Sequence, residues 1–152
     1  MDIALVEPEI PPNTGNIART CVMTGSKLHL IEPLGFSIAD KDVKRSGLDY
    51  WSWLNFECYP DYSTFKVHNS KSRLILFSTK GEKYYHQITY HIDDILVFGS
   101  ETKGLADEIL AQEEIIVRIP MIREIPRSLN LGNSVALTLY EALRQINFPG
   151  ML

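Results

Sequence analysis

The sequence predicts an α/β fold, with a mainly parallel β-sheet flanked by helices. Short apolar runs alternate along the chain with segments whose apolar residues recur at helical spacing, an alternation that is typical of this class. The apolar runs contain few polar side chains, as expected of strands that are buried on both faces. The chain has 152 residues, of which 45% are hydrophobic and 22% charged, so we expect residues 1–152 to form a single domain.

The first unit along the chain is predicted to be a strand, a loop and a helix. The apolar run from Ile3 to Val6 reads as a buried strand. Two prolines then lead to Asn13 and Thr14, which are residue types that can cap the N-terminus of a helix. The residues that follow have helical apolar spacing as far as Gly25, where the helix is expected to end.

The remaining elements continue the alternation. Residues 32–50 are irregular, with room for one short helix after Asp40. The last helix, over 130–146, carries apolar residues on two faces, which predicts that both faces are buried. The other predicted strands are 28–31, 73–79, 95–98 and 115–119, and the other predicted helices are 61–67 and 106–111.

The overall charge counts against a protein that holds nucleic acid by a broad basic surface. The formal net charge is -4 and the isoelectric point is near 5.5. RNA contacts would therefore have to come from local cationic patches, although the same patches also fit ordinary solvated faces. The candidate RNA-binding residues are Lys41, Lys44, Arg45, Arg123 and Arg127.

Composition also limits the chemistry. Cys21 and Cys58 form no C-x-x-C pair and read as ordinary reduced thiols. The four histidines lack the spacing of a helical metal pair, so no metal is expected. The chain begins without a basic, apolar leader and contains no long apolar stretch, so we expect no membrane association and a cytoplasmic location.

Three loops that follow predicted strands are candidate sites, because parallel sheets bind ligands at the carboxyl ends of their strands. The first, 8–19, places Asn13, Asn16 and Arg19 around a helix start, where donors suit a phosphate or a polar RNA edge. Helix capping by Asn13 or Thr14, with a surface arginine, is the alternative interpretation.

The other two loops differ in character. The second, 98–105, has glycines near both ends that let the backbone approach a ligand, with Glu101 between them. It matches neither a Walker loop nor a G-x-G-x-x-G pattern, and a simple turn is the alternative. The third, 119–134, is stiffened by prolines and runs into the final helix, which favours a site over an idle connection.

Together these segments resemble the three motifs of the SPOUT RNA methyltransferases, specifically the small single-domain group that modifies the tRNA wobble ribose at a cytidine or uridine. The resemblance covers essentially the whole chain and keeps the motif order. The matching segments are 8–17 with Arg19, 31–36, 47–50, 98–105 and 128–131.

The resemblance implies a C-terminal trefoil knot, a homodimer, and S-adenosylmethionine as a cofactor bound in a bent form. The substrate would be the anticodon loop of tRNA, methylated on a ribose 2'-hydroxyl. By matching positions, the cofactor-binding residues would be Phe77, Gly99, Ile119, Met121, Ser128 and Leu129, and the reaction centre would contain Asn13, Arg19, Glu101 and Asn130.

Within that implied site, Arg19 is assigned to orienting the phosphate or ribose, because guanidinium groups resist deprotonation. The 123–127 part of the third loop varies in the family, which leaves RNA preference open. Alternative functions are methylation of ribosomal RNA or of another tRNA position, a noncatalytic RNA-binding role, and a plain nucleotide-binding domain with phosphate at 99–104.

Overall fold

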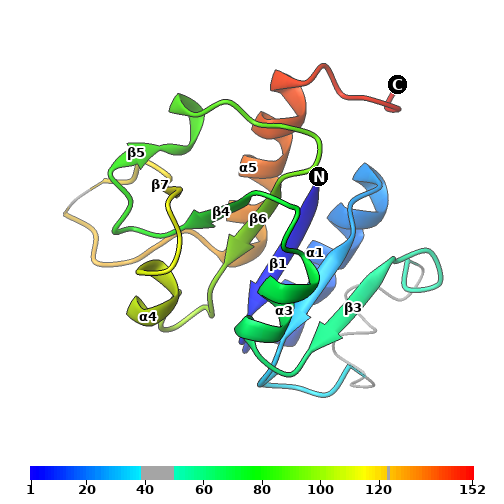
Figure 1. The fold of residues 1–152 in the computed structure, drawn as a ribbon, viewed down its shortest axis with the longest axis horizontal. Helices are drawn as coiled ribbons and strands as arrows, with labels where there is room; N and C mark the ends of the chain where they lie inside the picture. Colours follow the sequence, from blue (N-terminus) through cyan, green and yellow to red (C-terminus); the bar gives the residue numbers. More distant parts are fainter. Residues whose placement is uncertain (39–49, 123) are drawn as a thin grey trace.

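The computed structural model describes residues 1–38, 50–122 and 124–152 (Figure 1). Lys41, Lys44, Arg45 and Arg123 lie outside the described residues, as does the short helix expected after Asp40. The elements are β1 (Asp2–Val6), α1 (Pro11–Thr24), β2 (Leu28–Ile31), β3 (Phe56–Tyr59), α3 (Tyr62–His68), β4 (Leu74–Phe77), β5 (Lys83–Tyr84), the 3-10 helix η1 (Tyr85–Gln87), β6 (Ile95–Phe98), α4 (Asp107–Leu110), β7 (Ile116–Arg118) and α5 (Leu131–Gln145).

The described strands form one seven-stranded sheet in the order β3-β2-β1-β6-β4-β7-β5. Every pairing in this sheet is parallel, which confirms the predicted α/β class. The central strands are buried on both faces, as their apolar sequences require. Because the strands are parallel, the loops after β1, β4, β6 and β7 leave the sheet at the same edge.

Helices cover both faces of the sheet. On one face, Ile17 and Cys21 of α1 and Leu139 of α5 pack with alternate strand residues in the larger of two core clusters. On the other face, Phe65 of α3 and Leu110 of α4 belong to the second cluster. Figure 1 shows the same layering, with α3 in front of β1 and with α1 and α5 behind the sheet.

One face of α5 remains open in the single chain. Val135, Leu139 and Ala142 are fully buried, as predicted. Leu137 and Tyr140, however, are 42% and 44% exposed. The prediction that both faces of this helix are buried is therefore wrong for one isolated chain, because α1 and the sheet together cover only one side of it.

The start of α1 also differs from the prediction. The helix begins at Pro11, and its N-cap is Ile10, which makes no side-chain capping bond. Asn13 and Thr14 therefore lie inside the helix and cap nothing. The helix can begin this early because proline suits the first helical positions, where its missing N–H group is not needed. At the other end, Gly25 has the expected left-handed conformation.

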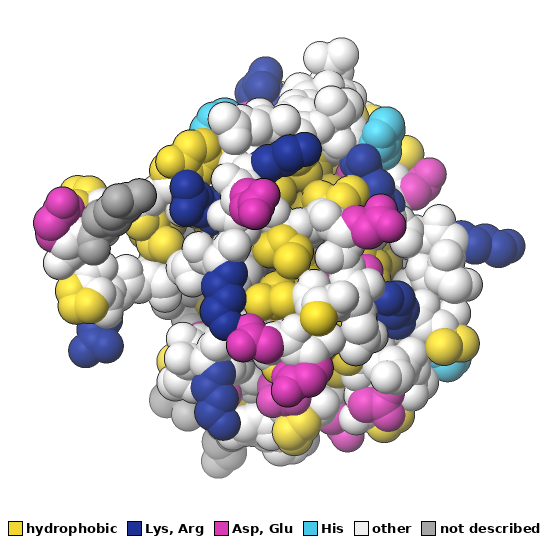
Figure 2. All heavy atoms as spheres, turned by 60° about the vertical axis from the view of Figure 1, so that its left-hand side comes forward, with side chains coloured by type: hydrophobic (Ala, Val, Ile, Leu, Met, Phe, Trp, Pro, Cys, Tyr) yellow, Lys and Arg dark blue, Asp and Glu magenta, His cyan; other side chains and the backbone are white. Residues whose placement is uncertain are grey.

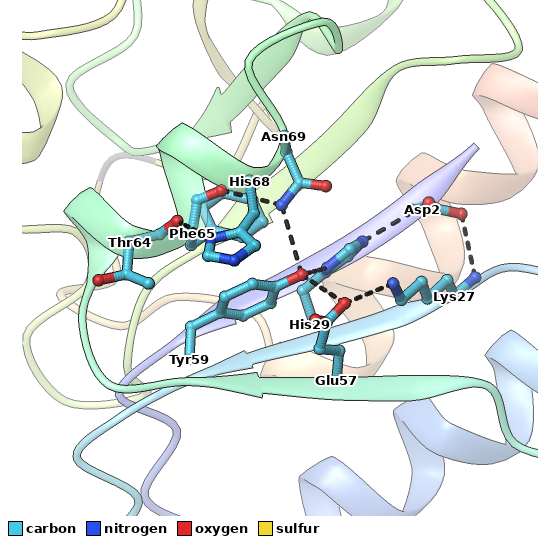
Figure 3. A network of polar contacts seen from close by, with 9 residues as sticks. All are labelled: Asp2, Lys27, His29, Glu57, Tyr59, Thr64, Phe65, His68 and Asn69. Atoms are coloured by element: carbon cyan, nitrogen blue, oxygen red, sulfur yellow. Dashed lines mark hydrogen bonds and ion pairs between the residues drawn. The ribbon is translucent and has the colours of Figure 1, made fainter.

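Edge strand β3 was not predicted, because only Tyr59 in it is buried. A polar network holds it to β2 (Figure 3). The Tyr59 hydroxyl lies 3.1 Å from His29 Nδ1 and donates to Glu57 Oε2 at 2.7 Å. Lys27 Nζ donates to the same oxygen at 2.6 Å, and this bond lowers the pKa of Glu57 and raises that of Lys27. Side-chain pairing thus supplies here what apolar burial does not.

Candidate active site

Two glutamates join the loop after β1 to the loop after β6, and we call this arrangement the glutamate clasp. Glu101 accepts hydrogen bonds from the backbone N–H groups of Glu9 at 2.8 Å and Ile10 at 3.1 Å. In return, Glu9 accepts from the backbone N–H of Thr102 at 3.1 Å and from its hydroxyl at 2.7 and 2.8 Å. The Glu101 carboxylate therefore supplies part of the capping that no side chain of Ile10 gives to α1.

A chain of amide side chains continues from the clasp to the start of α5. Asn13 Nδ2 donates to Glu101 Oε1 at 2.9 Å, and Asn13 Oδ1 accepts from Asn130 Nδ2 at 2.8 Å. Asn130 Oδ1 accepts from the backbone N–H of Asn133 at 3.3 Å, which makes Asn130 the N-cap of α5. This amide relay brings together three of the four predicted reaction-centre residues, from segments far apart in the sequence.

A cavity of about 560 Å³ lies against the relay. Its size is within the usual range for a site that holds a small molecule or cofactor. The predicted cofactor-binding residues Phe77, Gly99, Ile119, Met121, Ser128 and Leu129 all line it, together with Asn13, Glu101, Arg127 and Asn130. The structure thus gathers the six residues at one cavity, and their contact with a cofactor stays a prediction.

The cavity wall combines stacked aromatic rings with closely packed backbone. The rings of Phe77 and Phe98, on neighbouring strands β4 and β6, stack with centroids 4.5 Å apart. A Cβ atom at Gly99 would lie 2.1 Å from the carbonyl carbon of Gly104 and 2.2 Å from the nitrogen of Leu105. Only glycine fits this close approach within the 99–104 turn, whose residues line the cavity.

Arg19, the fourth predicted reaction-centre residue, lies elsewhere. It is exposed and is not among the described residues that line the cavity. Its guanidinium carbon lies 4.9 Å from the ring centroid of Tyr50. Arg19 does not share the face of Asn13, because a step of six residues along the α-helix places its side chain about 120° away around the helix axis.

Sequence reasoning missed several residues around the cavity. Glu9 and Thr102 lie within the quoted motifs but were given no role, and their reciprocal bonds were not visible from spacing. Lys80 also lines the cavity and forms an ion pair with Asp107.

Figure 2 shows the face formed by the left-hand side of Figure 1, where cationic side chains alternate with acidic ones around an apolar centre. The described residues of this face therefore form no broad basic surface, in agreement with the acidic composition of the chain.

The described part of the chain carries neither a cluster of metal ligands nor a membrane-spanning helix. No group of three or more His, Cys, Asp or Glu residues there is placed to hold a metal ion. No helix within the same residues is long and apolar enough to cross a membrane. Both cysteines are free, Cys21 buried and Cys58 exposed.

Comparison with known proteins identifies the family. The model of the SpoU rRNA Methylase family matches residues 1–140. The chain belongs to this family. The SpoU family match covers β1 to most of α5, and so includes the clasp, the relay and the cavity.

Two curated relatives and one solved structure match nearly the whole chain. A tRNA (cytidine(34)-2'-O)-methyltransferase of Saccharophagus degradans is 47% identical over 98% of this chain and 97% of its own length. The protein of that description from Escherichia coli K12 is 45% identical over 99% of this chain and 96% of its own length. A solved structure described as giving insights into 2-OH methylation of C/U34 on tRNA has a TM-score of 0.91 and 39% identity, covering 96% of this chain and 95% of that chain.

A more distant SpoU methyltransferase shows the fold alone. AviRb from Streptomyces viridochromogenes, crystallised in complex with AdoMet, has a TM-score of 0.88 at 22% identity. The alignment covers 97% of this chain and 58% of that chain. The parallel sheet and its flanking helices are thus those of SPOUT-type methyltransferases.

Proposed function

We propose that this protein transfers a methyl group from S-adenosylmethionine to the ribose 2'-hydroxyl of the wobble nucleotide, position 34, in the anticodon loop of tRNA. The observation that carries the proposal is the amide relay of Asn13 and Asn130, anchored by Glu101 beside a cavity of cofactor size. The descriptions of relatives at 45–47% identity over nearly the full chain support the substrate.

The cavity fits S-adenosylmethionine in both volume and chemistry. Its volume of about 560 Å³ suits a molecule of that size. The glycine turn and the loop 126–130 offer backbone groups, while Phe77 and Met121 offer apolar surface. When bound, this cofactor supplies an activated methyl group on a sulfonium centre. AviRb, which shares the fold, was crystallised with AdoMet, and this supports the same use here.

We assign the chain's own residues to orientation. The relay leaves Asn13 and Asn130 with fixed amide orientations, which is what positioning a ribose requires. Glu101 receives three hydrogen bonds through its carboxylate, so we assign it to holding Asn13 and the start of α1 in place. Holding two reactants in near-attack geometry is worth roughly 7 to 11 kcal/mol of the barrier.

We further propose that the protein acts as a homodimer in which Arg19 serves the cavity of the partner subunit. Arg19 is exposed on α1, away from the cavity of its own chain, while α5 leaves an apolar face uncovered beside α1. There the guanidinium would orient the phosphate or ribose of the RNA by paired hydrogen bonds. The C-terminal trefoil knot, which the family resemblance implies, belongs to the same proposal, together with the single domain over residues 1–152 and the cytoplasmic location expected from the sequence.

A labelling experiment tests the activity. The protein is incubated with isotope-labelled S-adenosylmethionine and either undermodified total tRNA or ribosomal RNA, and the methylated nucleotide is mapped by mass spectrometry. Label is expected on the 2'-oxygen of nucleotide 34 only. Label on ribosomal RNA or at another tRNA position would contradict the assignment. No label with any RNA, together with no cofactor binding in calorimetry, would indicate a noncatalytic protein.

Mixing two inactive variants tests the shared site. Arg19→Ala removes the arginine, and Gly99→Ala displaces the turn that lines the cavity. A mixed dimer of the two has one site with both parts intact, so random re-association should restore about a quarter of wild-type activity. If no activity returns although mixed dimers form, Arg19 does not act in the partner's cavity.

A further inference from the structure

Arg19, Tyr50 and Trp53 lie in a row, with Tyr50 half-buried between two exposed side chains, and we call this surface the aromatic strip. The guanidinium carbon of Arg19 lies 4.9 Å from the ring centroid of Tyr50. The Tyr50 and Trp53 rings meet edge to face, with centroids 6.5 Å apart and an interplanar angle of 67°. The strip therefore runs from a cation to an indole in three contacting side chains.

Trp53 is unusually open to solvent. It is 70% exposed, whereas the other exposed aromatic residues in the described part of the chain, Phe56, Tyr140 and Phe148, are 37%, 44% and 37% exposed. Exposing a large indole forgoes much of the hydrophobic stabilisation that its burial gives. A lone exposed side chain carries little meaning, but Trp53 is continuous with the Tyr50 ring, and contiguous apolar surface is typical of contact sites.

The neighbouring tryptophan shows that the core does not require Trp53. Trp51 is partly buried, packs against the larger core cluster, and meets Phe56 edge to face with centroids 5.5 Å apart. Packing in this segment is thus provided by Trp51. Trp53, two positions later, is open to solvent and contacts Tyr50, the ring over which the Arg19 guanidinium lies.

We propose that the aromatic strip stacks on an unpaired base of the substrate RNA, next to the nucleotide that is methylated. This inference rests on the proposed function. A guanidinium and aromatic faces are the groups on which splayed bases of single-stranded loops stack. Arg19 is assigned to the reaction centre, so a base held by Tyr50 and Trp53 flanks the reacting ribose.

The charge of the chain strengthens the choice of RNA as the occupant. With a formal net charge of -4, the protein cannot draw most of its RNA affinity from a broad basic surface. Stacking supplies affinity that does not depend on counterion release, so it suits a protein of net negative charge. Burial of Trp53 against a second copy of the chain is the rival outcome, and the test separates the two.

The first experiment replaces Trp53 by leucine, which keeps an apolar side chain but has no ring to stack. KM for an anticodon stem-loop should rise about tenfold or more, because base stacking on one aromatic residue contributes roughly that much affinity. Cofactor affinity and sedimentation should stay unchanged. Val67→Ala, which truncates a 72% exposed apolar residue on α3, is the control and should leave KM unchanged. A W53L variant with unchanged KM, or with an altered oligomeric state, would overturn the proposal.

The second experiment is independent of how that variant folds. The chain has two tryptophans, so Trp51→Phe leaves Trp53 as the only indole. The intact stem-loop should quench its fluorescence, and a fully paired duplex of the same stem should not. Equal quenching by both RNAs, or by neither, contradicts base stacking. If wild-type protein methylates nucleotide 34 while Trp53 shows neither effect, only this inference fails. If no RNA is methylated, the proposed function fails.

Discussion

The side-chain nitrogen of Asn130 donates a hydrogen bond to the side-chain oxygen of Asn13 at 2.8 Å, across 117 positions of the sequence. This bond joins the start of α5 to the first turn of α1. Because Asn13 also donates to Glu101, and Asn130 also accepts from Asn133, neither amide can rotate without losing a second bond. The orientation of both amides is therefore a property of the folded chain, and each can be tested by substitution.

Replacing Asn13 by aspartate should destabilise the protein and reduce methyl transfer. The new carboxylate would face the carboxylate of Glu101 in place of a donor that now lies at 2.9 Å. Losing a hydrogen bond to a charged group should lower the free energy of unfolding by about 1.5–3 kcal/mol. Urea denaturation measures this loss. Asn16→Asp, at an exposed position of the same helix, should change the value by less than about 0.5 kcal/mol. Equal effects of the two substitutions would contradict the relay.

Arg19→Lys should separate cofactor binding from turnover. Arg19 does not line the cavity of its own chain, so S-adenosylmethionine affinity, measured by calorimetry, should be unchanged. Lysine cannot reproduce the two parallel hydrogen bonds of a guanidinium, so turnover should fall about a hundredfold, as expected for a misplaced reactant. Methylation at the wild-type rate by this variant would remove Arg19 from the reaction centre.

Gly99 and Gly104 should respond differently to substitution. Gly99→Ala would place a methyl group against the backbone of Gly104, and the turn would have to shift to make room for it. Because this turn lines the cavity, cofactor affinity should fall at least about tenfold. Gly104 has a φ of +70° and open space around its Cβ position. This position therefore requires a residue that adopts the left-handed backbone conformation, and it has room for a side chain. Asparagine tolerates that conformation, and Gly104→Asn should fold with a thermal midpoint near that of wild type. Calorimetry and thermal denaturation check the pair; tight cofactor binding by Gly99→Ala would refute the close-approach argument.

The cap of α3 should make a pH-dependent contribution to stability. Asp61 accepts a hydrogen bond from the backbone N–H of Thr64 at 2.7 Å, and this bond lowers the pKa of the Asp61 carboxyl below its ordinary value of 3.8. A lowered pKa in the folded state means that the stabilisation is present above 3.8 and is lost as pH falls through the folded-state value. Asp61→Asn keeps the cap without titrating, so the advantage of wild type in thermal midpoint should shrink as pH falls from 5 to about 2. A constant difference over this range would show that the Asp61 carboxylate makes no such contribution.

The central part of the fold could be predicted because its signals are local. Strands β4 and β6 are continuous apolar runs, β1 is apolar after Asp2, and β2 is apolar apart from the buried His29, while α5 keeps its apolar period throughout. Edge strand β3 and the two-residue strand β5 carry no such pattern, since only Tyr59 in β3 is buried and no residue of β5 is. Such strands exist because a neighbouring strand pairs with them, which a local pattern does not record.

The sequence predicted which residues belong to the candidate site better than it predicted how they are arranged in space. Motif order was enough to nominate Asn13, Glu101 and Asn130, which the structure brings into one hydrogen-bonded chain. It could not show that Asn13 faces inward while Arg19, two turns later, faces outward. That difference depends on where α1 begins. Ile10 was not predicted as the N-cap, because two prolines follow it and because Asn13 and Thr14 are residue types that cap helices more often.

The reciprocal bonds between Glu9 and Thr102 and between Glu101 and Ile10 tie the 99–104 turn, which lines the cavity, to the start of α1. If S-adenosylmethionine binds in the cavity and RNA is held by α1, as proposed, the clasp connects the two binding sites. Because thermodynamic linkage is symmetrical, any tightening of RNA binding by the cofactor would be matched by an equal tightening of cofactor binding by RNA. The clasp would then favour simultaneous occupancy over binding of either ligand alone.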